Sequence, residues 1–240
     1  LQYLSYKCLN TNILKSFLIN NINNYSGINI TLPFKINAYQ IVDDHDLSAK
    51  TIKAVNCINN INNRLVGYNT DVYGFKRMIK NIDINIKDYD ILILGNGGAA
   101  RSVLSVLHNY TNNDIFIWGR NTSKVNSFIK DFYSSQVKFF NNNANKSCIV
   151  INCLSLDIGN CSIKSILNKI SSINMELFID LNYFETLLSK TLKEKKYNVI
   201  LAHDMFIFQA LKSFDIWFNN KYHNKITYDE LKTLLKNEKN

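Results

Sequence analysis

The chain has 240 residues, of which 46% are hydrophobic and 20% charged, and this composition excludes a wholly disordered protein. That length supports one large domain or two small ones, each with its own core. No apolar run approaches the roughly 18 residues needed to cross a bilayer, and the first residues do not form a secretory signal. We therefore expect no membrane association.

The formal charge of +9 at pH 7 raises the question of nucleic-acid binding. Only four of the 28 basic residues are Arg, whereas 37 residues are Asn. Lys, Asn and Ile are the residues that an AT-rich genome over-produces, so the charge has a mutational explanation. We expect no nucleic-acid partner. A basic surface also favours an anionic small molecule as substrate or cofactor.

The five cysteines are an odd number without close pairing, which does not resemble a disulfide framework. None of them has the C-x-x-C or Cys/His spacing of a zinc site. We therefore predict reduced thiols, a cytoplasmic location and no metal site.

The first 80 residues alternate short apolar runs with polar turns. The pattern predicts helices over 12–22, 34–42 and 72–80, a helix start at 46–48, and strands over 27–30, 54–58 and 65–68. Asn59 to Asn63 is the expected turn between the last two strands. The single proline, Pro33, suits the start of a helix.

A second pattern begins with Asp90 to Leu94, a continuous apolar run typical of a buried parallel strand. Strands are then predicted over 114–118, 148–151, 177–180 and 199–201, and helices over 99–109, 122–133, 163–170, 185–195, 206–218 and 228–236. This alternation predicts a doubly wound α/β sheet. The Asn-rich stretch 141–146 is an expected loop.

The strongest local motif is G-N-G-G-A-A over 95–100, which matches G-x-G-x-x-G/A between a predicted strand and a helix. Gly95 permits a tight turn, Gly97 lets the backbone approach a pyrophosphate, and Ala100 allows close packing of helix on strand. The helix N-terminus adds a positive dipole end. The motif predicts a Rossmann-type dinucleotide site, and the alternative is a plain glycine turn.

The end of the next strand bears on which dinucleotide binds. An NAD site usually has Asp or Glu there to hold the ribose hydroxyls. This strand ends instead in Trp118-Gly119-Arg120-Asn121, and Lys124 follows. A basic pair without an acid suits the 2′-phosphate of NADP, and the alternative is that Arg120 and Lys124 are ordinary surface charges.

Other polar residues lie at predicted strand ends or helix starts in the first third of the chain, namely Thr31, Lys35, Asn56 and Asp71. A carbonyl reduction needs a proton donor near the oxygen that gains negative charge. A Lys beside a carboxylate can serve as that donor. Spacing alone, however, does not distinguish Lys35 and Asp71 from a solvated charge and a turn residue.

Four segments, in this order, resemble the shikimate dehydrogenase family. They are G-I-N-I-T-L-P-F-K (27–35), A-V-N-C (54–57), G-Y-N-T-D-V-Y-G-F (67–75) and G-N-G-G-A-A-R (95–101). Weaker matches are W-G-R-N-T-S-K (118–124), D-L-N-Y-F-E-T (180–186) and Gln209-Ala210 followed by Phe214 and Trp217. The similarity covers nearly the whole chain.

The resemblance implies a Rossmann-type doubly wound NADP-binding domain over 76–204. It also implies a smaller, discontinuous α/β substrate domain made of 1–75 and 205–240. The family begins with a strand and an S-x-S motif that binds the substrate carboxylate, and we expect this first strand to be missing here because Lys35 comes roughly 30 residues early.

The activity implied by the resemblance is the NADPH-dependent, reversible reduction of 3-dehydroshikimate to shikimate, a step of chorismate and aromatic amino-acid biosynthesis, by a monomer or homodimer. Lys35 and Asp71 would form the catalytic pair. The substrate would be bound by Thr31, Asn56, Asp71 and Gln209. NADP would be bound by Gly95, Asn96, Gly97, Gly98, Ala99, Arg120 and Lys124.

Several positions depart from the family pattern. Gly119 stands where the family has Asn, and Asn121 where it has Thr. The family's N-A-T-P-x-G-M segment reads N-C-L-S-L-D-I here, over 152–158. His203 stands where the family has a glycine. We expect His203 to be a solvated loop residue, although it could instead narrow the cofactor cleft.

Two other functions stay open. A decayed, non-catalytic NADP-binding protein is the main alternative, and a reading frame that extends upstream and restores S-x-S would favour the enzyme. A related quinate or shikimate dehydrogenase that uses NAD is disfavoured by Arg120.

Overall fold

The computed structural model describes residues 2–132, 134–141, 147–155, 160–223 and 225–237. Internal contacts divide the chain into unit 1, which is Leu1–Thr70 with Ala210–Thr227, and unit 2, which is Asp71–Gln209 with Tyr228–Asn240. The sequence-based division placed 71–75, 205–209 and 228–240 with the first unit instead. The functional role of each unit stays a prediction.

Unit 1 contains a mixed four-stranded sheet in the order β1-β3-β4-β2. Its strands are β1 (Ile28–Asn29), β2 (Asp44–His45), β3 (Cys57–Ile61) and β4 (Arg64–Tyr68). The β3–β4 hairpin turns at Asn62 and Asn63, which have φ of 53° and 60°, as a two-residue type I′ turn requires. The expected turn over 59–63 was therefore too long, because Asn59 and Asn60 already pair with β4.

The strand predicted over 54–58 begins three residues later than expected, at Cys57. The backbone N–H of Val55 donates to the carbonyl of Lys35 at 2.8 Å, and that of Asn56 donates to Tyr68 at 3.1 Å. These residues therefore form a loop that ties the sheet to the helix beginning at Lys35.

The structure confirms the predicted helices of unit 1 and the predicted helix start at 46–48, and it adds a 3₁₀ turn that was not predicted. They are α1 (Thr11–Asn21), the 3₁₀ turn η1 (Ile22–Asn24), α2 (Lys35–Ile41), α3 (Leu47–Ile52) and the second half of α9 (His203–Trp217). The Asn10 side chain caps α1 by accepting the N–H of Ile13 at 2.9 Å, and Asp46 caps α3 through Ser48 at 2.9 Å. The unit's buried cluster includes Leu14, Leu18, Ala38, Ile58 and Leu65.

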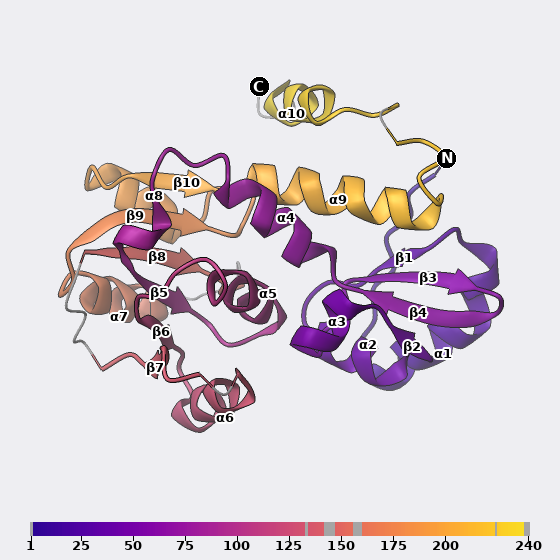
Figure 1. Ribbon diagram of the computed structural model, residues 1–240, viewed down its shortest axis with the longest axis horizontal. Coiled ribbons are helices and arrows are strands. Elements are labelled where there is room, and N and C mark those ends of the chain that lie inside the picture. The colour runs from indigo at the N-terminus through magenta and orange to yellow at the C-terminus, as the bar shows by residue number, and fades with distance from the viewer. Residues whose placement is uncertain (1, 133, 142–146, 156–159, 224, 238–240) are drawn as a thin grey trace. The chain divides into compact units, whose positions relative to one another are not determined.

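Unit 2 is built on a six-stranded parallel sheet (Figure 1). The strands are β5 (Asp90–Leu94), β6 (Ile115–Trp118), β7 (Val137–Phe139), β8 (Cys148–Asn152), β9 (Met175–Asp180) and β10 (Val199–Leu201). Their order, β10-β9-β8-β5-β6-β7, is that of the Rossmann fold, in which ligands bind where the order reverses beside the first strand, here β5. Sequence analysis missed β7 because it is three residues long and centred on Lys138.

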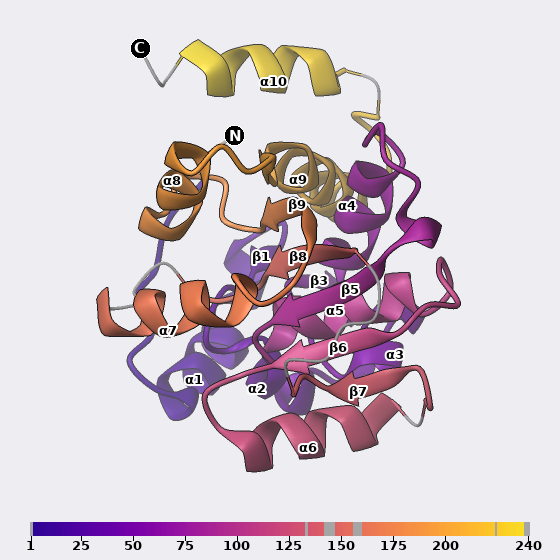
Figure 2. The same cartoon turned by 90° about the vertical axis from the view of Figure 1, so that its left-hand side faces the viewer.

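Helices cover both faces of this sheet (Figure 2). The helices of unit 2 are α4 (Thr70–Ile79), α5 (Gly98–Leu107), α6 (Thr122–Phe132), α7 (Asn160–Ile170), α8 (Leu187–Glu194) and the first half of α9, with the 3₁₀ turn η2 (Ile86–Asp88). A further helix of this unit, α10 (Tyr228–Asn237), lies beyond α9 and not on the sheet. Ile91 and Ile93 of β5 cluster with α4, α5 and α6, whereas Leu92 and Leu94 cluster with α7 and α8. Burial on both faces explains the continuous apolar run of β5. Residues 142–146 of the expected Asn-rich loop lie outside the described residues.

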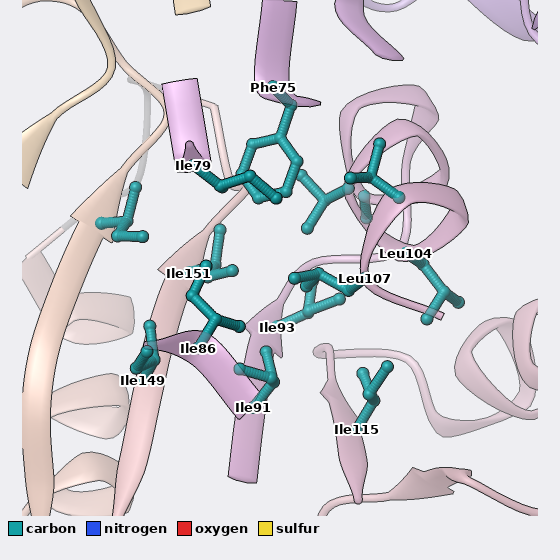
Figure 3. Packing of buried hydrophobic residues seen from close by; sticks show 14 of the residues in the cluster. Phe75, Ile79, Ile86, Ile91, Ile93, Leu104, Leu107, Ile115, Ile149 and Ile151 are labelled. Carbon is teal, nitrogen blue, oxygen red and sulfur yellow. The ribbon is translucent and has the colours of Figure 1, made fainter. Parts of the chain in front are cut away.

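The first of these two clusters is drawn in Figure 3. Phe75 and Ile79 of α4 lie over the sheet, above Ile93 of β5 and Ile151 of β8. Phe75, Ile93 and Ile151 have no exposed surface. Helix α4, which begins in the N-T-D segment of the sequence, is thus anchored in the core of unit 2.

A glycine permits a close crossing of α4 and α9. A β-carbon at Gly74 would lie 2.5 Å from the backbone oxygen of Met205 and 3.0 Å from the Gln209 Cβ. We expect Gly74→Ala to destabilise the protein by about 1–3 kcal/mol, or about 2–12 °C in Tm, because a backbone atom cannot move aside without shifting a helix.

Thermal unfolding followed by circular dichroism would measure this loss. Gly97→Ala is the matched control, since a β-carbon at Gly97 would meet nothing within 4 Å. Equal melting temperatures for the two variants would contradict the prediction.

Candidate active site

The glycine loop lies at the carboxyl end of β5, directly before α5. Gly95 has φ of +110°, a conformation that L side chains rarely adopt. Gly97 is the N-cap of α5, and the space where its β-carbon would stand is open to 4 Å. An anionic group can therefore approach both the loop backbone and the positive end of the helix dipole.

The other residues of the loop divide into packed and accessible positions. Gly98 and Ala100 are buried, and Ala100 belongs to the main cluster of unit 2, as its predicted packing role requires. Asn96 and Ala99 are half-buried. The Asn96 Oδ1 lies 3.6 Å from where a β-carbon of Gly119 would stand, so the loop and the end of β6 are neighbours.

Two basic side chains follow β6. Arg120 and Lys124 are both exposed, and neither forms an ion pair with another residue in the part of the chain that the structure describes. Asn121 caps α6 by accepting the backbone N–H of Lys124 at 2.9 Å, which holds Lys124 in the first turn. This strand end therefore offers positive charge to a phosphate.

Arg101 serves a different purpose, although it falls within the G-G-A-A-R segment. Its guanidinium pairs with Asp131 of α6 and lies over the Phe128 ring, 5.3 Å from the centroid. Arg101 therefore joins α5 to α6.

A buried carboxylate organises the ends of β8 and β9. Asp180 has no exposed surface and accepts hydrogen bonds from Asn152 at 3.0 Å, Asn182 at 2.8 Å and Thr186 at 2.7 Å. Burial, and then the charge of Asp180, raise the pKa of the Cys153 thiol well above its ordinary value. The D-L-N-Y-F-E-T segment thus has a structural role in shaping this edge of the sheet. The last three residues of 152–158 lie outside the described residues.

Unit 1 brings together three of the predicted site residues. The N–H of Ile30 donates to the Asn56 carbonyl and the N–H of Val55 to the Lys35 carbonyl, both at 2.8 Å. Thr31 directly follows Ile30 and is exposed, whereas Lys35 is half-buried as the first residue of α2. Pro33 was expected at the helix start but precedes it by two residues, in a turn closed by the Phe34 N–H and the Thr31 carbonyl at 3.0 Å.

Asn56 is buried, with 3% of its surface exposed, and its carboxamide is held by Thr70. The Asn56 Oδ1 accepts the backbone N–H of Thr70 at 2.7 Å, and its Nδ2 donates to the Thr70 hydroxyl at 3.0 Å. That hydroxyl lies 3.1 Å from the Ser213 Oγ. Sequence reasoning missed Thr70 and Ser213; Thr70 lies within the N-T-D segment, but no motif indicated Ser213.

The remaining two predicted substrate residues lie in unit 2. Asp71 is in the first turn of α4 and 6% exposed, and Gln209 is half-buried in α9, where its Nε2 donates to the Phe206 carbonyl at 3.0 Å. The close crossing at Gly74 brings α4 against α9 at Gln209. Because Lys35 belongs to unit 1 and Asp71 to unit 2, their catalytic pairing stays a prediction.

His203 is not the loop residue that the sequence suggested. It is the first residue of α9, because Ala202 already bonds back to Asp180 at 2.9 Å and accepts from Phe206 at 3.0 Å. Its half-buried side chain lines a cavity of about 600 Å³ in unit 2, together with Asp204 and Lys232. Those two form an ion pair at 3.2 Å.

Within the described ranges, no group of three or more His, Cys, Asp or Glu side chains could hold a metal ion. The helices described there are all too short or too polar to cross a bilayer. The parallel sheet, the glycine loop at its reversal point and the basic strand end define a Rossmann-type dinucleotide-binding protein with a second, smaller α/β unit.

Comparison with known proteins gives a consistent result. A sequence model of the shikimate dehydrogenase substrate binding domain matches residues 2–58. The shikimate dehydrogenase (NADP(+)) of Methanococcus aeolicus is 36% identical over 205 residues, which are 80% of this chain and 72% of that protein. The enzyme of the same name from Clostridium botulinum is 31% identical over 226 residues, or 90% and 85% of the two chains.

Solved structures agree with these sequence matches. The crystal structure of shikimate dehydrogenase from Aquifex aeolicus superposes with a TM-score of 0.74 at 26% identity, covering 94% of this chain and 83% of that one. The chain belongs to the shikimate dehydrogenase family.

Proposed function

We propose that this chain is an NADP-dependent oxidoreductase that interconverts 3-dehydroshikimate and shikimate, a step toward chorismate and the aromatic amino acids. The observation that carries the proposal is the 36% identity to a shikimate dehydrogenase (NADP(+)) across 72% of that enzyme. The four segments that resemble the family also contain the two residues to which we assign proton transfer, Lys35 and Asp71.

The residues at the carboxyl end of β5 fit NADP. When bound, NADP(H) supplies or accepts the hydride. Gly95 and Gly97 would hold the pyrophosphate against α5 with Asn96, Gly98 and Ala99, because the space at Gly97 is open and the helix end is positive. Arg120 and Lys124 would bind the 2′-phosphate, since both are exposed and basic at the end of β6.

Proton transfer is assigned to Lys35 and Asp71. The ammonium of Lys35 would donate a proton to the carbonyl oxygen of the substrate as that oxygen gains negative charge, and would take the proton back in the reverse direction. The Asp71 carboxylate would orient the ammonium. Thr31, Asn56 and Gln209 would bind the ring hydroxyls. The hydrogen bond from Val55, the neighbour of Asn56, to the Lys35 carbonyl supports a shared role for Asn56 and Lys35.

The proposal extends to location and assembly. Cys8, Cys57, Cys148 and Cys153 are free thiols, which fits the reducing cytoplasm. We infer an enzyme that acts there as a monomer or homodimer on a small molecule, without a nucleic-acid partner.

The direct test is shikimate-dependent reduction of NADP⁺, followed at 340 nm with purified protein. Turnover that requires both compounds supports the proposal. Tight NADP binding without turnover would support the non-catalytic alternative instead.

A further inference from the structure

A closed ring of hydrogen bonds surrounds Asn56 within unit 1. The Asn29 Nδ2 donates to the Asn56 carbonyl and to the Ser213 Oγ, both at 3.1 Å. The Ser213 Oγ lies 3.1 Å from the Thr70 Oγ1, and that atom accepts from the Asn56 Nδ2 at 3.0 Å. The ring thus begins at the backbone of Asn56 and returns to its side chain.

The chemistry of the donors permits only one orientation of two amides. The Asn56 backbone carbonyl can only accept, so the Asn29 Nδ2 is the group that faces it and Ser213, and the Asn29 Oδ1 accepts from the Tyr3 hydroxyl at 3.1 Å. A flipped Asn56 carboxamide would set its NH₂ against the backbone N–H of Thr70, which now donates to Oδ1 at 2.7 Å. The two bonds to Thr70 therefore allow the Asn56 carboxamide only one orientation.

Ser213 is the member that closes the ring. It comes from α9, whereas Asn29 ends β1, Asn56 directly precedes β3 and Thr70 is the first residue of α4. Ser213 has no exposed surface and Thr70 has 1%. Water cannot easily replace the serine hydroxyl at this depth, so loss of that hydroxyl leaves both Asn29 and Thr70 with one bond fewer.

We infer that Ser213 is a positioning residue for the substrate-binding carboxamide of Asn56, acting through Thr70 and Asn29. The inference rests on the proposed function, in which Asn56 binds a ring hydroxyl of shikimate. On this inference Ser213, a residue of α9, influences the affinity for shikimate without itself contacting the substrate.

Ser213→Ala in the full chain is the primary test. We expect the KM for shikimate to rise about tenfold, the scale of one lost hydrogen bond, while kcat falls less than threefold and the KM for NADP changes less than twofold. Ser213→Thr keeps the hydroxyl and should restore most of the affinity. Thr70→Val removes the hydroxyl from the opposite side and should reproduce the rise in KM.

The matched control is Ser189→Ala in unit 2. Ser189 is also fully buried and hydrogen-bonded, in the capping box of α8, so its loss should lower Tm without changing the KM for shikimate. If Ser213→Ala likewise lowers only Tm, the serine is structural and the inference is wrong. When Asn56 is already replaced by Ala, Ser213→Ala should cause no further rise in the KM for shikimate. An equal rise in KM with and without the Asn56→Ala change would overturn a role of Ser213 through Asn56.

A measurement without substrate separates this inference from the proposed function. The Thr70 backbone N–H reports directly on its bond to the Asn56 Oδ1. We expect Ser213→Ala to speed hydrogen exchange of Thr70 about tenfold, while the Ala38 amide, bonded to Phe34 at 2.8 Å in the same unit, keeps its protection. Unchanged Thr70 exchange overturns the inference even in a chain that proves inactive, whereas a wild-type chain without turnover overturns only the proposed function.

Discussion

The Lys35→Ala variant is expected to lose about 10²–10⁴-fold in kcat for shikimate oxidation, the range that positioned acid–base groups contribute. The physical reason is that the substrate oxygen changes charge as the hydride moves, and a proton donor or acceptor must lie within hydrogen-bond reach. The interaction between Lys35 and the substrate oxygen is strongest in the transition state, so kcat should fall far more than KM rises.

A double-mutant cycle tests whether Lys35 acts with Asp71. If the two form one unit, Lys35→Ala combined with Asp71→Ala should cost little more than the worse single change. Lys50→Ala is the matched control, because Lys50 lies on α3 of the same unit and is exposed; we expect near-normal kcat from it. Strictly multiplicative losses, or near-normal kcat in Lys35→Ala, would mean that the catalytic group lies elsewhere.

The Arg120→Ala variant is expected to bind NADP⁺ at least tenfold more weakly and to bind NAD⁺ almost unchanged. A charge-assisted hydrogen bond to a phosphate contributes about 1.5–3 kcal/mol, which is about 10- to 150-fold in affinity. NAD⁺ lacks the 2′-phosphate, so it has no such bond to lose. Isothermal titration calorimetry with each cofactor would measure both constants.

Two further variants control this experiment. Gly97→Ala should weaken NADP⁺ and NAD⁺ to a similar extent, because both share the pyrophosphate that the Gly97 backbone would approach. Lys130→Ala removes one charge from the last turn of α6 and should leave both affinities unchanged. Equal losses of NADP⁺ and NAD⁺ in Arg120→Ala would refute the assignment of this residue to the 2′-phosphate.

Most strands and helices of unit 2 could be predicted from local features of the sequence. The apolar run of β5, the glycine turn and the helix after it are local features, because burial on both faces demands continuous apolar residues and the φ of +110° at Gly95 favours glycine. The order and spacing of the four motif segments likewise identified the family. The strands that sequence analysis missed, β2 and β7, are two and three residues long, too short to show a period.

Contacts between distant polar side chains could not be predicted from the sequence and are seen in the folded chain. Thr70 and Ser213 are 143 residues apart in sequence yet 3.1 Å apart at their hydroxyls, and no periodicity encodes a contact of that separation. The same holds for the ion pair between Arg101 and Asp131, which are 30 residues apart in sequence. Local patterns follow from backbone geometry and burial, whereas hydrogen bonds between distant side chains depend on how the elements pack.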